Sequence, residues 1–122
     1  MIDLGNHSLL DCYDCRSNLL DDPDELALLL VRAAKAAGTT VLASHQHRCD
    51  PHGVVAVCFL AESHLSIRTW PELRHATVDV YSWSVSGDPV AACLEIIAEL
   101  GPERHDLVTV ARGARVNVLG RS

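Results

Sequence analysis

The chain has 122 residues, of which 48% are hydrophobic and 21% are charged, a composition typical of one small folded domain. Its formal net charge is −6 and its ten lysines and arginines form no basic stripe, which argues against nucleic-acid binding. No apolar run is long enough to span a bilayer and no signal peptide is evident, so we expect a cytoplasmic protein that does not bind membranes.

In chain order, the sequence first predicts a strand over 7–15 and then a helix. Asp22 can cap this helix, Pro23 suits its first turn, Glu25 stands where a capping box has an acid, and Gly38 favours a left-handed C-cap. Further strands are predicted over 39–48, 54–61 and 63–70, the first two separated by a turn at 50–53.

Alternation of polar and apolar residues predicts another strand over 77–84. Asp88 and Pro89 then repeat the helix-start chemistry, which predicts a second helix over 90–100. A last strand is expected over 106–112, with a possible short extension over 115–119. This order predicts a single α+β domain over 1–122, a two-layer sandwich with both helices packed on one face of a mostly antiparallel sheet.

Glu62, Ser63 and His64 stand at the junction of two predicted strands. A serine hydroxyl at such a junction can attack the carbonyl of the preceding residue and form an ester. Elimination of that ester leaves a dehydroalanine, which hydrolyses to a pyruvoyl group. Serine next to histidine is common, so this pattern alone is a weak signal.

The stretch from Glu62 to Glu72 reads ESHLSIRTWPE and resembles the processing-site motif of bacterial and archaeal S-adenosylmethionine decarboxylases. Matching positions continue over roughly residues 4 to 112; they include Gly5, His7, Tyr13, Cys15, His47, Arg48, Pro51, Gly53, Val54 and the run Val78–Tyr81. The resemblance implies cleavage between Glu62 and Ser63 into a β chain (1–62) and an α chain (63–122).

The same resemblance implies a cofactor made from the chain itself, because Ser63 would become an N-terminal pyruvoyl group. In that family the pyruvoyl ketone binds the substrate amine as a Schiff base and accepts electrons as CO₂ leaves. It also implies a small amino-acid substrate, a role in polyamine biosynthesis, a homodimer and no metal.

Four positions depart from the family pattern. Val55 and Arg68 replace a serine and a histidine that assist processing in the family. Trp83 replaces the cysteine that protonates the product carbon, and Cys49 replaces an aromatic ring that stacks on adenine. Glu72 is retained and is a candidate contact for polar groups of the substrate. Tyr81, His64 or a water are candidates for the missing proton donor.

Three interpretations remain open. The departures favour a changed substrate, L-ornithine or L-arginine, whose distal cation would contact Asp50 and the face of Trp83. The first alternative is an S-adenosylmethionine decarboxylase with unusual auxiliary residues. The second is an unprocessed, non-catalytic homologue or partner subunit, which the loss of two processing residues favours.

Two further motifs are assigned no function. His45, His47 and Cys49 would share one face of a strand, as zinc ligands can, but this spacing recurs in any strand and we expect no metal. Cys12 and Cys15 form a C-x-x-C in a predicted strand rather than at a helix start. We expect ordinary buried thiols that point to opposite faces.

Overall fold

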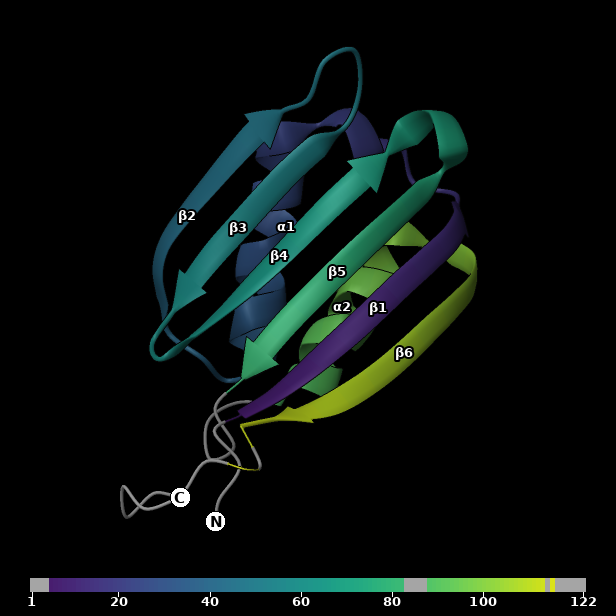
Figure 1. Cartoon of the computed structure of the whole chain (residues 1–122). Coiled ribbons are helices and arrows are strands. Elements are labelled where there is room, and N and C mark those ends of the chain that lie inside the picture. Colours follow the sequence, from purple (N-terminus) through teal and green to yellow (C-terminus); the bar gives the residue numbers. More distant parts are fainter. Residues whose placement is uncertain (1–4, 83–87, 114, 116–122) are drawn as a thin grey trace.

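The computed structural model describes residues 5–82, 88–113 and 115 (Figure 1). In these ranges the strands are β1 (Gly5–Cys15), β2 (Val41–Arg48), β3 (Val54–Leu60), β4 (Ser63–Trp70), β5 (His75–Ser82) and β6 (Pro102–Arg112). The α-helices are α1 (Pro23–Ala36) and α2 (Pro89–Leu100), and the short 3₁₀ helices are η1 (Asn18–Asp21) and η2 (Pro71–Leu73).

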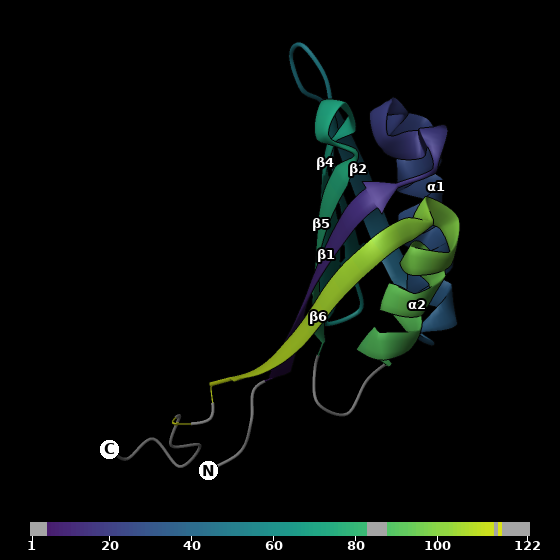
Figure 2. The ribbon, with the colours of Figure 1, turned by 90° about the vertical axis from the view of Figure 1, so that its right-hand side faces the viewer.

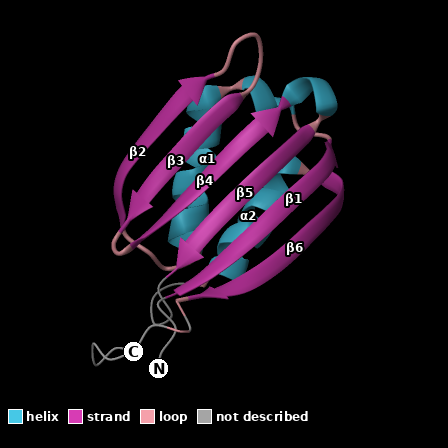
Figure 3. Cartoon of the chain, in the orientation of Figure 1, coloured by secondary structure: helices cyan, strands magenta, loops and turns pink. Residues whose placement is uncertain are grey.

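The strands form one sheet in the order β2-β3-β4-β5-β1-β6, and each neighbouring pair is antiparallel. Both α-helices lie on the same side of this sheet, as the edge-on view in Figure 2 and the colouring in Figure 3 show. The predicted fold class, a two-layer α+β sandwich, is therefore confirmed. Neither helix in the described ranges is long and apolar enough to cross a membrane.

Both helices begin where the sequence predicts. The Asp22 carboxylate accepts a hydrogen bond from the backbone N–H of Glu25 at 3.1 Å, and Pro23 takes the first turn of α1. The Asp88 carboxylate accepts from the N–H groups of Val90 and Ala91 at the start of α2. These caps satisfy amides that the helix itself leaves without partners.

The two faces of the sheet differ because side chains alternate along each strand. The face toward the helices, called the inner face below, carries the apolar core with α1 and α2; its fully buried members include Leu10, Leu65, Ile67, Val78, Leu26, Leu29, Leu30 and Ile96. The opposite, outer face carries His7, His64, Arg68, Asp79 and Tyr81, which the pairing of the strands places in neighbouring rows.

Two sequence-based predictions about strands are wrong. β6 begins at Pro102, four residues before the predicted start, because a proline is tolerated as the first residue of a strand. Cys12 and Cys15 do not point to opposite faces: both are buried in the core. The intervening Asp14 has a φ of +53°, and this left-handed residue breaks the alternation and turns Cys15 inward.

Candidate active site

The predicted cleavage point lies in a tight turn between β3 and β4. Leu60 pairs with Ser63, and only Ala61 and Glu62 connect them. Glu62 has a φ of +68°, in the left-handed region that residues other than glycine rarely adopt, at a cost of about 1 kcal/mol or more. The strained residue is thus the one whose carbonyl Ser63 would attack.

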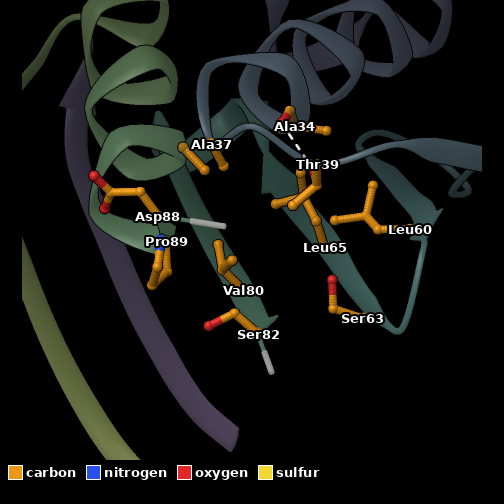
Figure 4. A pocket seen from close by; sticks show the side chains of 11 residues that line it. Ala34, Ala37, Thr39, Leu60, Ser63, Leu65, Val80, Ser82, Asp88 and Pro89 are labelled. Atoms are coloured by element: carbon orange, nitrogen blue, oxygen red, sulfur yellow. Dashed lines mark hydrogen bonds between the residues drawn. The ribbon is translucent and has the colours of Figure 1, made fainter. Parts of the chain in front are cut away.

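Ser63 faces a narrow cavity between the inner face and the two helices (Figure 4). β4 and β5 contribute Ser63, Leu65, Val80 and Ser82; the remaining walls are Leu60, Thr39, Ala34 and Ala37 on one side and Asp88, Pro89 and Ala92 on the other. The volume of about 10 Å³ corresponds to roughly one water position. The cavity therefore does not accommodate an amino-acid substrate in this form of the chain, which is uncleaved.

Ser82 is a candidate that the sequence analysis did not select. Tyr81 pairs with His64, so Ser82 is the next residue on the strand beside Ser63 and lies on the same inner face. The residue is 5% exposed and its side chain lines the same cavity, with the hydroxyl visible in Figure 4. Asp88 lines that cavity too, but its carboxylate already caps α2.

His64 and Tyr81 lie on the outer face, across the sheet from the Ser63 side chain. Their rings stack with centroids 5.4 Å apart and planes 8° apart. His7 contacts Tyr81 edge-on at 5.8 Å, and its Nε2 lies 3.4 Å from the Asp79 carboxylate without forming a hydrogen bond. The proposed proton donors Tyr81 and His64 thus do not share the cavity of Ser63 within one uncleaved chain.

Arg68 also lies on the outer face, where it pairs with Val55 across β3 and β4. Its guanidinium carbon lies 4.8 Å from the centroid of the Trp70 ring, and its buried Nε has no hydrogen-bond partner in the part of the chain that the structure describes. Val55 and Arg68, the two positions at which the resemblance implies processing residues, are therefore adjacent. Arg68 stands five positions after Ser63, about 16 Å along an extended strand.

The proposed substrate-binding residues lie at the other end of the sheet. Glu72 is exposed in η2, which follows β4, and Cys49 and Asp50 follow β2. β4 begins at Ser63 and has 8 residues, a length of about 23 Å, so these residues do not meet Ser63 within one chain (Figure 1). Trp83 lies outside the described residues.

Three of the four buried thiols have a raised pKa, and the fourth, Cys15, has a lowered one. Burial raises the pKa of Cys58, and it raises the pKa of Cys93 to about 11. A hydrogen bond to Cys15, together with burial, raises the pKa of Cys12, and the same bond lowers the pKa of Cys15. Both residues of this pair are shielded from solvent, which disfavours a nucleophilic role.

No three His, Cys, Asp or Glu side chains among the described residues gather closely enough to hold a metal ion. His45 and His47 lie on the outer face of β2, paired with Val57 and Val55. Cys49 is beyond the end of β2, so the row of three ligands considered for zinc does not form along that strand.

Known proteins resemble this chain along nearly its whole length. A sequence profile described as S-adenosylmethionine decarboxylase matches residues 6–113. The chain belongs to the S-adenosylmethionine decarboxylase family. A relative named S-adenosylmethionine decarboxylase proenzyme from Methanococcus maripaludis strain C5 is 40% identical over 113 residues, 93% of each chain. One with the same name from Prochlorococcus marinus MIT 9313 is 42% identical over 109 residues, 89% of this chain and 87% of its own.

A solved structure supports the same conclusion. The crystal structure of the adenosylmethionine decarboxylase from Aquifex aeolicus superimposes with a TM-score of 0.83, at 38% identity and over 100% of both chains. The family resemblance found in the ESHLSIRTWPE motif is therefore confirmed, and with it the family's description as decarboxylase proenzymes of polyamine biosynthesis.

Proposed function

We propose that this family member is a proenzyme that cleaves itself between Glu62 and Ser63 and then decarboxylates S-adenosylmethionine. The observation that carries the proposal is the turn at the cleavage point, in which Ser63 follows a residue held in a left-handed conformation. Relatives at about 40% identity named as proenzymes support it.

In the proposed cleavage, the Ser63 Oγ bonds to the carbonyl carbon of Glu62 and the peptide C–N bond breaks, giving an ester. Loss of the Ser63 α-proton then expels the main-chain carboxylate of Glu62, which becomes the C-terminus of the β chain. Hydrolysis of the resulting dehydroalanine releases ammonia and leaves the pyruvoyl group. Release of the strain at Glu62 favours the first step. The resulting pyruvoyl group supplies an electron sink for decarboxylation. Ser63 fits this role because it is the first residue of β4 and borders a cavity.

The choice of S-adenosylmethionine replaces the ornithine or arginine that the sequence alone favours. S-adenosylmethionine carries a sulfonium cation, which the Arg68 charge would repel if the two lay close together in the site. In the structure the Arg68 guanidinium stacks over Trp70 on the outer face, about 16 Å along β4 from Ser63 of the same chain. The Arg68 charge of the same chain is therefore remote from substrate bound at that Ser63.

A homodimer is part of the proposal. Val55 and Arg68 stand at positions that assist processing in the family, yet both lie away from Ser63 of their own chain. Glu72, Cys49 and Asp50 are equally remote from it. A second copy can bring its Glu72, Cys49 and Asp50 to the cleavage turn if two outer faces meet, because that turn lies at the end of the sheet. We also retain the cytoplasmic location as a prediction.

One preparation tests cleavage and substrate together. Intact mass spectrometry should show a 1–62 fragment and a second fragment whose N-terminus is blocked, and Ser63→Ala should give one uncleaved chain. When S-adenosylmethionine, ornithine and arginine are compared, CO₂ release should be fastest with S-adenosylmethionine. Faster release from either amino acid would contradict the proposed substrate. The second candidate function is a non-catalytic homologue, which the replacements Val55 and Arg68 favour. A wild-type chain that stays intact after long incubation would support it.

A further inference from the structure

A second cavity lies between η1 and η2, at the end of the sheet away from Ser63. Its volume is about 390 Å³, within the size range of small-molecule sites. Polar side chains form most of its wall: Arg16, Ser17, Asn18, Asp21 and Arg74. The proposed decarboxylation assigns no role to this cavity.

Arg74 lines this cavity and has an unfavourable backbone conformation. Its φ is +53° and its ψ +40°, in the left-handed region where glycine is the unstrained residue. Its Nε donates a hydrogen bond to the Cys15 carbonyl at 3.0 Å, and the Cys15 N–H donates to the Arg74 carbonyl at 2.9 Å. These two contacts fix the Nε end of the guanidinium group. Its two terminal nitrogens remain able to donate hydrogen bonds to a ligand.

The charges around this cavity favour an anion. In the described part of the chain, neither Arg16 nor Arg74 forms an ion pair within 4.0 Å. Asp21 is the one acid in the wall, and it is already engaged by the Gly53 N–H at 2.9 Å and by Arg48 at 3.2 Å. The hydroxyl of Ser17 accepts from the Leu19 N–H, so its own proton remains available to a ligand.

We propose that this cavity binds the phosphate group of a small molecule, with Arg16 and Arg74 as its main contacts. Two guanidinium groups present paired N–H donors that match phosphate oxygens, and the hydroxyl of Ser17 and amide of Asn18 add neutral donors. The inference goes beyond the proposed decarboxylation and does not depend on cleavage.

Phosphate binding can be measured on full-length Ser63→Ala protein, which separates this test from that of the proposed function. Titration calorimetry and thermal melts would use inorganic phosphate and glycerol phosphate, with sodium chloride at matched ionic strength. At ten times its dissociation constant, phosphate should raise the melting temperature by about 5 °C, and chloride should not. Tighter binding of glycerol phosphate would identify an ester as the occupant, and equal or weaker binding would identify free phosphate.

Arg74→Gly is the sharpest variant because glycine adopts a φ of +53° without strain, so the fold should survive. This variant and Arg16→Gln should each weaken phosphate binding by about tenfold or more. Arg32→Gln, which removes an arginine on α1 at 4.0 Å from Glu99, is the matched control and should bind normally. Equal phosphate shifts in all variants, or no binding of either phosphate compound, would overturn the proposal.

Discussion

The strained backbone of Glu62 lies next to the peptide bond that is proposed to break. The effect of that strain can therefore be measured as a change in the rate of cleavage. Glycine adopts a φ of +68° readily, so Glu62→Gly should relax the turn in the precursor. If the strain of about 1 kcal/mol is released on the way to the ester, its removal should slow cleavage about fivefold. The measurement is a time course of intact mass spectra on freshly made precursor.

The control for this prediction separates strain from charge. Glu62→Gln keeps a side chain in the left-handed conformation but lacks the carboxylate. It should therefore cleave faster than Glu62→Gly. Equal rates for the two variants would assign the effect to the lost carboxylate and would contradict a role for strain.

Ser82 provides a second prediction, because its hydroxyl borders the same narrow cavity as Ser63. We expect Ser82 to position the Ser63 hydroxyl or a water beside it. Ser82→Ala should slow cleavage by at least about tenfold while the melting temperature stays nearly constant. Ser82→Thr should restore much of the rate, since it retains the hydroxyl. Ser66→Ala, on the outer face of β4, is the control; a matching loss in that variant would argue against Ser82.

At the scale of single elements, the sequence predicts helices well because their start signals are local. Asp22–Pro23 and Asp88–Pro89 each place an acceptor and a preset φ at a helix start, and both α-helices begin there. The inward orientation of the Cys15 side chain, by contrast, has no local sequence signal. It depends on the left-handed Asp14, whose conformation no neighbouring residue signals.

Thr69 joins three elements at the end of the sheet opposite the cleavage turn, and its replacement should destabilise the fold. Its hydroxyl donates to the Leu20 carbonyl of η1 and accepts from the Val54 N–H of β3 at 2.9 Å, and the residue is fully buried. Thr69→Val would leave both backbone groups without partners. Urea denaturation should show a loss of about 2–3 kcal/mol in the free energy of unfolding.

Thr77→Val is the matched control for this measurement. Thr77 lies on β5 and pairs with Arg68 on the half-exposed outer face, where water can replace a lost hydrogen bond. The same change there should alter stability by less than about 0.5 kcal/mol. If both variants lose the same stability, the buried hydroxyl of Thr69 does not hold η1 and β3 together as we expect.

At the scale of the whole molecule, the sequence indicates which residues carry the chemistry but not which of them lie together. The motif from Glu62 to Glu72 identifies the family, but it spans a full strand, so its first and last residues lie at opposite ends of the sheet. Alternation also places Ser63 and Arg68 on different faces. The continuous motif therefore identifies the candidate residues from sequence alone. Only the fold shows that they lie at two ends of the sheet and on its two faces.

This distribution leads to the last prediction, which concerns the outer face. That face exposes large apolar side chains on β1, β3 and β6, with 37–55% of each accessible; they are Leu9, Phe59, Val108 and Val110. If two copies pack through it, Phe59→Asp should bury a charge at the interface and shift the protein from dimer to monomer in gel filtration with light scattering. Cleavage or decarboxylation should fall with dimer content, since the second copy would supply the residues remote from Ser63.

Leu28→Asp is the control for this prediction, because Leu28 is 52% exposed on α1, on the helical side of the molecule. It introduces the same charge on a comparably exposed apolar residue and should remain dimeric. A wild-type protein that is monomeric at micromolar concentration and still cleaves would contradict the dimer. A dimer broken by Leu28→Asp but not by Phe59→Asp would instead place the contact on the helices, and the outer-face residues would then need another route to Ser63.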